Sequence, residues 1–149
     1  MKVAYVGREI SKGGANLLPI LNSLPEDVEW KMFCSKSDLG ATSLLLKHRR
    51  ELRKYDVIHL NTSLYGAFTR RIKKPIVCSV HTIQKTEYAF DPTFRNRLGI
   101  FFEASTIQKV DKFLAVSQSV ANDLLWQYPN VNKDNVEVLP HVEIGRAHV

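Results

Sequence analysis

Short apolar runs rich in β-branched residues alternate with longer amphipathic stretches along the chain, and this alternation limits the folds that it can adopt. The runs predict strands at Lys2–Val6, Glu29–Cys34, Asp56–Leu60, Ile76–Val80, Phe113–Val116 and Val136–Leu139. The stretches between them predict helices at Ala15–Ser23, Thr42–Lys54, Ser63–Ile72, Thr93–Val110 and Ser119–Gln127. Strands joined by helices pair in parallel through right-handed crossovers. The sequence therefore predicts an α/β fold with one doubly wound, mainly parallel open sheet, a Rossmann-like arrangement in a single domain.

Composition excludes several other classes of protein. The chain has 149 residues, of which 44% are hydrophobic and 24% are charged, so it can bury a core without disulfides. Its two cysteines, Cys34 and Cys78, lie in strand-like runs with no CxxC spacing and no paired histidine, so we expect buried reduced thiols and no metal site. No apolar run approaches the roughly 20 residues that span a bilayer. The N-terminal sequence reaches charged side chains too early for a signal peptide, so we expect a soluble, cytoplasmic chain.

Positive charge is concentrated in one part of the chain. The net charge is +6, yet the stretch from Ala41 to Lys74 holds nine basic and two acidic residues, which leaves the rest close to neutral. Helical spacing places apolar side chains on one face of the expected helix, namely Ala41, Leu44, Leu45, His48, Leu52 and Tyr55. The remaining surface carries Lys47, Arg49, Arg50, Arg53 and Lys54. Two interpretations stay open: a solvated basic face, or a surface that meets anionic lipid head groups. We do not expect nucleic acid as a partner, because no aromatic platform for stacked bases accompanies the charges.

Small or polar residues follow the strands of the expected sheet. These positions are Gly13-Gly14, Asn61-Thr62-Ser63, His81-Thr82, and Ser117 with Ser119. In an open parallel sheet, ligands bind beyond the carboxyl ends of the strands, so these residues should share one edge. Residues of this kind suit a carbohydrate or phosphate ligand.

Individual residues of this edge allow both a structural and a functional interpretation. Gly13 and Gly14 either make a plain turn or let the backbone approach a phosphate or sugar, and their sequence is neither a G-x-G-x-x-G fingerprint nor a Walker loop. His81 either is a satisfied structural residue or hydrogen-bonds a hydroxyl and accepts a proton. His59 lies inside a strand, where core packing is expected, and Ser119 is expected to cap the following helix.

Several segments in succession resemble the N-terminal half of family-4-type glycosyltransferases with the GT-B fold. They are KVAYVGRE with KGGAN, YDVIHLNTS, KPIVCSVHTI, DKFLAVSQSVANDL and NVEVLP, between Met1 and about Pro140. The resemblance implies two Rossmann-like domains facing a cleft. It also implies transfer of a sugar from a nucleotide-sugar donor with retention of anomeric configuration, with no required metal or other cofactor. The first domain of such enzymes selects the acceptor, a glycan or a lipid-linked molecule, and basic helices on it bring lipid-bearing acceptors from a membrane.

The resemblance also assigns roles by position. Gly13 and Gly14 match the glycine loop near the donor phosphates and the acceptor. His81 matches the histidine beside the transferred sugar, and Ser117 lies at the rim of the acceptor side. Asn61 and Thr82 join the candidate donor- or acceptor-binding residues because they follow strands at the same edge.

The C-terminal end departs from the family pattern. The family continues after NVEVLP toward a second domain that supplies the nucleotide pocket, whereas this chain ends in Glu143–Val149 (EIGRAHV), which matches one reading frame of a common sequencing adapter. We expect residues 1–142 to form the acceptor-side domain and residues 143–149 to be a non-native tail, and the alternative is an ordinary C-terminal tail. We also expect the chain alone to be inactive as a transferase and its exposed cleft face to favour self-association. The alternative is a non-catalytic α/β module that binds a sugar or a phosphorylated ligand at the same edge.

Overall fold

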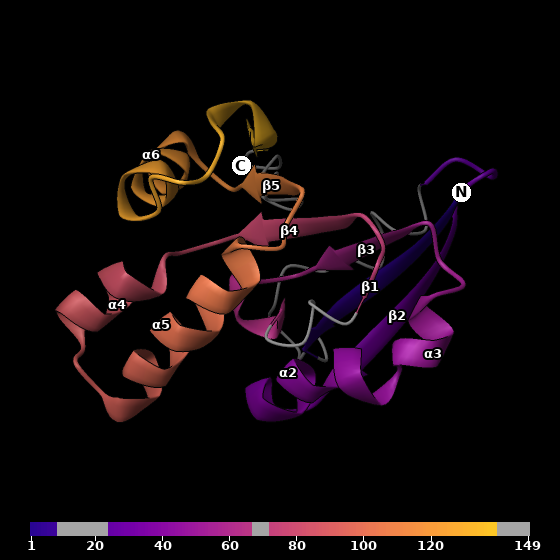
Figure 1. Cartoon of the computed structure of the whole chain (residues 1–149), viewed down its shortest axis with the longest axis horizontal. Helices are drawn as coiled ribbons and strands as arrows, with labels where there is room; N and C mark the ends of the chain where they lie inside the picture. The colour runs from indigo at the N-terminus through magenta and orange to yellow at the C-terminus, as the bar shows by residue number, and fades with distance from the viewer. Residues whose placement is uncertain (9–23, 67–71, 140–149) are drawn as a thin grey trace, which may run out of the picture.

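The structure is a computed structural model that describes residues 1–8, 24–66 and 72–139 (Figure 1). Its strands are β1 (Lys2–Arg8), β2 (Glu29–Ser35), β3 (Val57–Leu60), β4 (Ile76–Val80), β5 (Lys112–Ala115) and β6 (Val136–Val138). Its helices are α2 (Asp38–Lys47), α3 (Arg49–Leu52), α4 (Gln84–Phe90), α5 (Phe94–Ile107) and α6 (Gln118–Gln127), with 3-10 turns η1 (Ser63–Gly66) and η3 (Lys133–Asn135). The predicted strands are therefore confirmed, and their bounds agree to within about two residues.

The strands form one open sheet in the order β2-β1-β3-β4-β5-β6, and every neighbouring pair is parallel. The chain passes from β1 to β2 on one side and then returns to place β3 on the other side of β1. The order of strands therefore reverses beside β1, which is the topological switch point of an open α/β sheet. The predicted Rossmann-like α/β fold is confirmed.

One face of the sheet carries the deepest part of the core. Val6, Leu60 and Cys78 are direct neighbours on β1, β3 and β4, and all three are fully buried. Helices α2 and α5 contribute Leu45 and Ile107 to the same core. Continuous apolar strands, such as the one that contains Cys78, fold in the centre of a sheet because helices cover them.

The predicted basic helix forms as two helices, α2 and α3. His48 separates them with φ −102° and ψ 15°, and its ring packs against that of Phe33 with centroids 5.2 Å apart. The predicted apolar face is confirmed across the break, since Leu44, Leu45 and Leu52 are buried. The spacing of the apolar residues therefore predicted correctly which side of α2 and α3 faces the sheet, although the helix is not continuous.

Other helices differ from the prediction in number and in their first residues. Helix α4 was not predicted, because its sequence QKTEYAF has no helical apolar repeat and no side chain caps its N-terminus. The prediction that Ser119 caps α6 is wrong, since Ser117 Oγ accepts the hydrogen bond from the Val120 backbone N–H at 3.2 Å. The helix predicted at 63–72 is described only as far as η1, and the one predicted at 15–23 lies outside the described residues.

The two cysteines lie in different environments. Cys78 is buried in the central strand β4, as predicted, but the prediction for Cys34 is wrong: its side chain is exposed on the face of the edge strand β2 opposite the buried Phe33. Within residues 1–8, 24–66 and 72–139, no group of three His, Cys, Asp or Glu side chains is arranged to hold a metal ion. In the same described part of the chain, no helix is long and apolar enough to cross a membrane.

Candidate functional site

The carboxyl ends of the parallel strands meet at one edge of the sheet, and four of the predicted site residues follow them there. Asn61 follows β3, His81 and Thr82 follow β4, and Ser117 comes shortly after β5. This edge includes the switch point beside β1, where open α/β sheets bind their ligands. We refer to it below as the carboxyl edge.

Asn61 packs directly against the end of β1 at the switch point. Its backbone N–H donates a hydrogen bond to the Val6 carbonyl at 2.9 Å. A Cβ atom on Gly7 would lie 3.0 Å from the Asn61 Cβ, so the absence of a side chain at Gly7 allows this close approach. Gly13 and Gly14 lie outside the described residues, so their place at the carboxyl edge stays a prediction.

A carboxylate on α4 fixes the orientation of Thr82. The Thr82 hydroxyl donates to Glu87 Oε1 at 2.6 Å, and Gln84 Nε2 donates to the other carboxylate oxygen of Glu87 at 3.3 Å. Because the hydroxyl proton points to Glu87, the lone pairs of Thr82 Oγ1 can accept a hydrogen bond from a ligand.

His59 packs beneath the carboxyl edge and stays neutral near pH 7. Its Nε2 lies 2.8 Å from Ser79 Oγ, and its ring packs edge-on against Tyr5 with centroids 5.1 Å apart. Burial, and secondarily the charge of His81, lowers the pKa of His59 to about 4. His59 is half-buried and does not belong to the buried core, so the core-packing prediction is not confirmed; His81 is also half-buried and lies at the edge itself.

Ser117 places the N-terminus of α6 at the carboxyl edge. Its Oγ accepts from the Val120 N–H, which leaves the hydroxyl proton available to donate. The unpaired N–H groups and the positive end of the dipole in the first turn of a helix favour negative charge. This part of the edge therefore suits a phosphate or another anionic group.

Glu103 joins several segments of this edge, although the sequence pattern did not single it out. Its fully buried carboxylate accepts hydrogen bonds from Ser63 Oγ at 2.7 Å, the Gln84 N–H at 3.0 Å and the Tyr128 hydroxyl at 2.9 Å. Burial raises the pKa of Glu103 above its ordinary value, although these hydrogen bonds oppose the shift. The donors lie 40, 19 and 25 residues away in the sequence, so the only signal was an acidic residue in the apolar run FFEAS.

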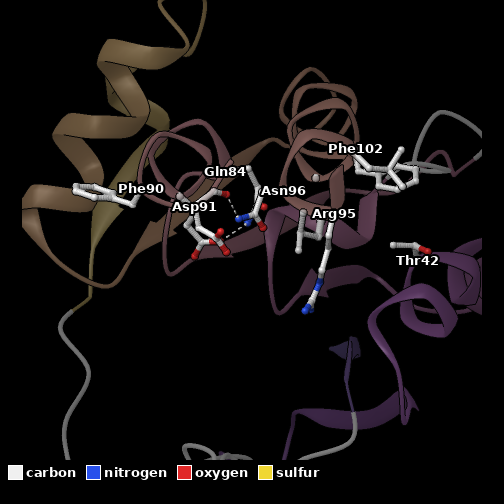
Figure 2. A pocket seen from close by; sticks show the side chains of 11 residues that line it. Thr42, Gln84, Phe90, Asp91, Arg95, Asn96 and Phe102 are labelled. Atoms are coloured by element: carbon white, nitrogen blue, oxygen red, sulfur yellow. Dashed lines mark hydrogen bonds between the residues drawn. The ribbon is translucent and has the colours of Figure 1, made fainter. Parts of the chain in front are cut away.

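A cavity of about 550 Å³ opens beside the carboxyl edge (Figure 2). Gln84 and Glu87 connect it to the edge, because both residues line the cavity and both belong to the hydrogen-bonded group around Thr82. Figure 2 shows Arg95 extending away from α5. The full lining is Thr42, Leu64, Gln84, Glu87, Phe90, Asp91, Arg95, Asn96, Leu98, Gly99 and Phe102. None of these residues was a candidate from the sequence.

The predicted basic patch lies apart from the carboxyl edge. Its residues are Lys47, Arg49, Arg50, Arg53 and Lys54, and all of them are exposed. In Figure 1, α3 lies toward the amino ends of the strands, whereas the candidate ligand residues follow the carboxyl ends. Glu51 places one negative charge among these basic residues. Its carboxylate accepts a hydrogen bond from Lys31 Nζ at 2.5 Å, which lowers the pKa of Glu51. The structure therefore does not bring the basic patch and the predicted ligand residues together.

Comparison with known families gives a match over most of the chain. The model of Glycosyltransferase Family 4 matches residues 14–142. The chain belongs to glycosyltransferase family 4. The match to this glycosyltransferase family includes all four described residues of the carboxyl edge, Asn61, His81, Thr82 and Ser117.

One solved structure has the same fold as this family 4 chain. The crystal structure of Anabaena HepE in complex with UDP-glucose matches with a TM-score of 0.58 and 18% sequence identity. The match covers 94% of this chain and 43% of the HepE chain, so the family 4 chain described here spans less than half the length of that protein. No curated protein matches the sequence.

Proposed function

We propose that this family 4 chain is the acceptor-side half of an enzyme that transfers a sugar from a nucleotide-sugar donor to a glycan or glycolipid, with retention of anomeric configuration. The observation that carries the proposal is the gathering of Asn61, His81, Thr82 and Ser117 at one edge of an all-parallel sheet. The fold shared with HepE, which was crystallised with UDP-glucose, supports a nucleotide sugar as the donor.

In this proposal the residues of the carboxyl edge divide the contacts with the donor among them. The half-buried imidazole of His81 meets a hydroxyl of the transferred sugar. Thr82 Oγ1, oriented by Glu87, accepts a hydrogen bond from another hydroxyl. Ser117 and the N-terminus of α6 stabilise negative charge that develops on the leaving phosphate, since a preorganised donor needs no reorganisation during the reaction. Gly13 and Gly14 approach the same phosphates, as the family resemblance implies.

The proposal extends to where the protein acts and to its other partners. We place it on the cytoplasmic side, peripheral to the membrane, with the basic patch facing anionic lipid. Its cleft face takes part in self-association. The chain alone does not transfer sugar, because the family resemblance assigns the nucleotide pocket to a second domain.

Titration of the ¹⁵N-labelled chain with UDP-glucose, followed by NMR, tests the proposed site. Chemical shift changes are expected to gather at residues 61–63, 81–82 and 117–120. His81→Ala should weaken binding about fivefold, which corresponds to the loss of roughly one hydrogen bond. Glu29→Gln is the matched control and should bind normally, because Glu29 is an exposed residue at the amino end of β2.

Two results would count against the proposal. Shift changes confined to other parts of the chain, or unaltered binding by His81→Ala, would remove the carboxyl edge as the sugar site.

A further inference from the structure

A second cavity, of about 520 Å³, lies at the opposite end of the strands from the carboxyl edge. Its lining comes from the end of α5, the beginning of β5 and the segment that joins α6 to β6. These segments lead into β5 and β6, which pair in parallel, so the cavity lies at the amino ends of these two strands. We call it the amino-edge cavity. The described residues that line it are Ala104, Ile107, Gln108, Val110, Phe113, Gln127, Tyr128, Pro129, Asn130, Val131, Asn132 and Asn135.

Side-chain amides supply the polar part of this lining, without any charged group among the twelve described lining residues. Each amide offers an acceptor oxygen and two donor hydrogens. The titratable side chain of the lining is Tyr128, and burial raises the pKa of its phenol, so it too is neutral near pH 7. A charged ligand would lose its hydration here without meeting an opposite charge. The lining therefore complements a ligand that is rich in hydrogen-bonding groups and uncharged. The amides belong to Gln108, Gln127, Asn130, Asn132 and Asn135.

The turn that carries three of these amides is held in shape by its own hydrogen bonds. Asn132 Oδ1 accepts from the Asp134 N–H at 3.0 Å, and the Asn132 carbonyl accepts from the Asn135 N–H at 3.0 Å. The side-chain amides of Asn130 and Asn135 form no hydrogen bond within the described part of the chain. Both are therefore available to a ligand on a backbone that is already ordered, which lowers the entropic cost of binding.

An apolar floor lies beneath the amides. Phe113 and Ile107 are buried side chains of this floor. The Tyr128 ring is fixed from two directions, because its hydroxyl donates to Glu103 at 2.9 Å and Lys85 Nζ lies 4.6 Å from its centroid. A sugar ring has C–H groups that pack against such a floor and hydroxyl groups that reach the amides. Apolar walls with a few convergent polar groups, in a volume between roughly 300 and 1,000 Å³, are typical of small-ligand sites.

We propose that the amino-edge cavity binds an uncharged saccharide, as a second sugar site separate from the carboxyl edge. An extended peptide fits less well, because the lining ends at Asn135, before β6 begins, and so offers no strand edge for backbone pairing. The inference does not rest on the transfer reaction proposed above, since it uses none of the residues of the carboxyl edge.

NMR titration of the ¹⁵N-labelled chain with trisaccharides tests the site. The uncharged probes are maltotriose, cellotriose and triacetylchitotriose, and trigalacturonic acid is an anionic probe of similar size. At least one uncharged probe should shift the signals of residues 107–113 and 127–135, and the anionic probe should leave them unchanged.

Substitutions in the lining then locate the saccharide. Asn130→Ala and Asn135→Ala should each weaken binding of the uncharged probe about fivefold, the loss of roughly one hydrogen bond. Ala104→Leu keeps every amide but fills part of the cavity, and it should weaken binding at least as much. Asn122→Ala is the matched control, because Asn122 is an exposed amide on α6 outside the cavity, and it should bind normally. Far-UV circular dichroism checks that each variant keeps the fold.

Several results would overturn the inference. They are the absence of shift changes at the amino-edge cavity with all three uncharged probes, equally tight binding of trigalacturonic acid, and unaltered binding in the Asn130, Asn135 and Ala104 variants. Shift changes only at residues 61–63, 81–82 and 117–120 would also overturn it, because the saccharide would then occupy the carboxyl edge. The trisaccharides carry no nucleotide or phosphate, so failure here leaves the outcome of the UDP-glucose titration independent.

Discussion

Replacing Glu103 by alanine tests whether one buried carboxylate holds the candidate site together. The carboxylate accepts hydrogen bonds from Ser63, Gln84 and Tyr128, which belong to η1, the beginning of α4 and the end of α6. Alanine removes the acceptor from all three donors. Because the side chain is fully buried, bulk water does not take its place.

The magnitude follows from the three donors. An unsatisfied buried donor costs about 1–3 kcal/mol. The two hydroxyl groups can rotate toward other acceptors, so the cost of each lies at the lower end of this range. The backbone N–H of Gln84 is fixed in place, so its cost is higher. We therefore expect Glu103→Ala to lower the free energy of unfolding by about 4 kcal/mol. At about 2–4 °C per kcal/mol for a domain of this size, Tm should fall by about 8–16 °C.

Glu103→Gln is the matched control for shape. The glutamine keeps one acceptor oxygen, and its amide can donate to a hydroxyl that rotates, so we expect a loss of only about 1 kcal/mol. The pKa of Glu103 is raised in the folded chain, so the folded state holds the carboxyl proton more tightly than the unfolded state does. The stability contributed by this proton is complete below about pH 4.5 and is lost as pH rises through the folded pKa. The unmodified chain should therefore lose stability relative to Glu103→Gln as pH rises.

Urea denaturation of the three proteins, followed by circular dichroism between pH 4 and pH 8, measures these differences. A loss of under about 1 kcal/mol for Glu103→Ala would show that the donors find other partners, because even one orphaned donor costs that much. Equal losses for alanine and glutamine would show that the negative charge matters and the acceptor geometry does not. Either result would refute the description of Glu103 as the acceptor that joins these segments.

Two further predictions concern the sheet and the packing of η1. Because the pKa of His59 is about 4 in the folded chain against an ordinary 6.5, its contribution to stability is complete above pH 6.5 and is lost as pH falls toward 4, by about 3 kcal/mol at most. His59→Gln should reduce the acid-induced loss seen in urea denaturation, and an unchanged loss would contradict the assignment. Gly66→Ala should destabilise the fold by about 1–3 kcal/mol, because the new Cβ would overlap the side chain of Thr106, which is held by a hydrogen bond to the Phe102 carbonyl at 2.9 Å. Adding Thr106→Ala removes the two nearest atoms, Cγ2 and Oγ1, and leaves the Thr106 Cβ 2.8 Å away, so the loss caused by Gly66→Ala should be smaller in a Thr106→Ala background; an equal loss in both backgrounds would contradict this explanation.

The sheet was predictable from the sequence because its strands are short, apolar and bounded by polar turns. Ile76–Val80 agrees with the structure at both ends, since a strand covered by neighbours on both sides leaves a continuous apolar run. The positions of Asn61, His81 and Ser117 at one edge then follow from parallel pairing alone. The burial of Cys34 was predicted wrongly, because the sequence places Cys34 on the apolar face of β2 whereas the structure buries Phe33 on the other face.

The remaining features depend on contacts between segments that are distant in the sequence. The break at His48 depends on its packing against Phe33 from β2, and spacing along one helix cannot show that contact. The choice of Ser117 over Ser119 as the cap of α6 depends on where β5 ends, which local sequence gives only to within a few residues. Glu103 was missed for the same reason, because its donors are brought to it only by the assembled fold.

A crystal structure of the chain grown with saturating UDP-glucose is the most direct test of the central claim, that the carboxyl edge is the sugar site. The account predicts that the glucose and the diphosphate lie at the ends of β1, β3, β4 and β5, with a sugar hydroxyl within hydrogen-bond distance of His81 and a phosphate near the N-terminus of α6. A ligand bound at the amino ends of the strands, or one that makes no contact with His81, would contradict it.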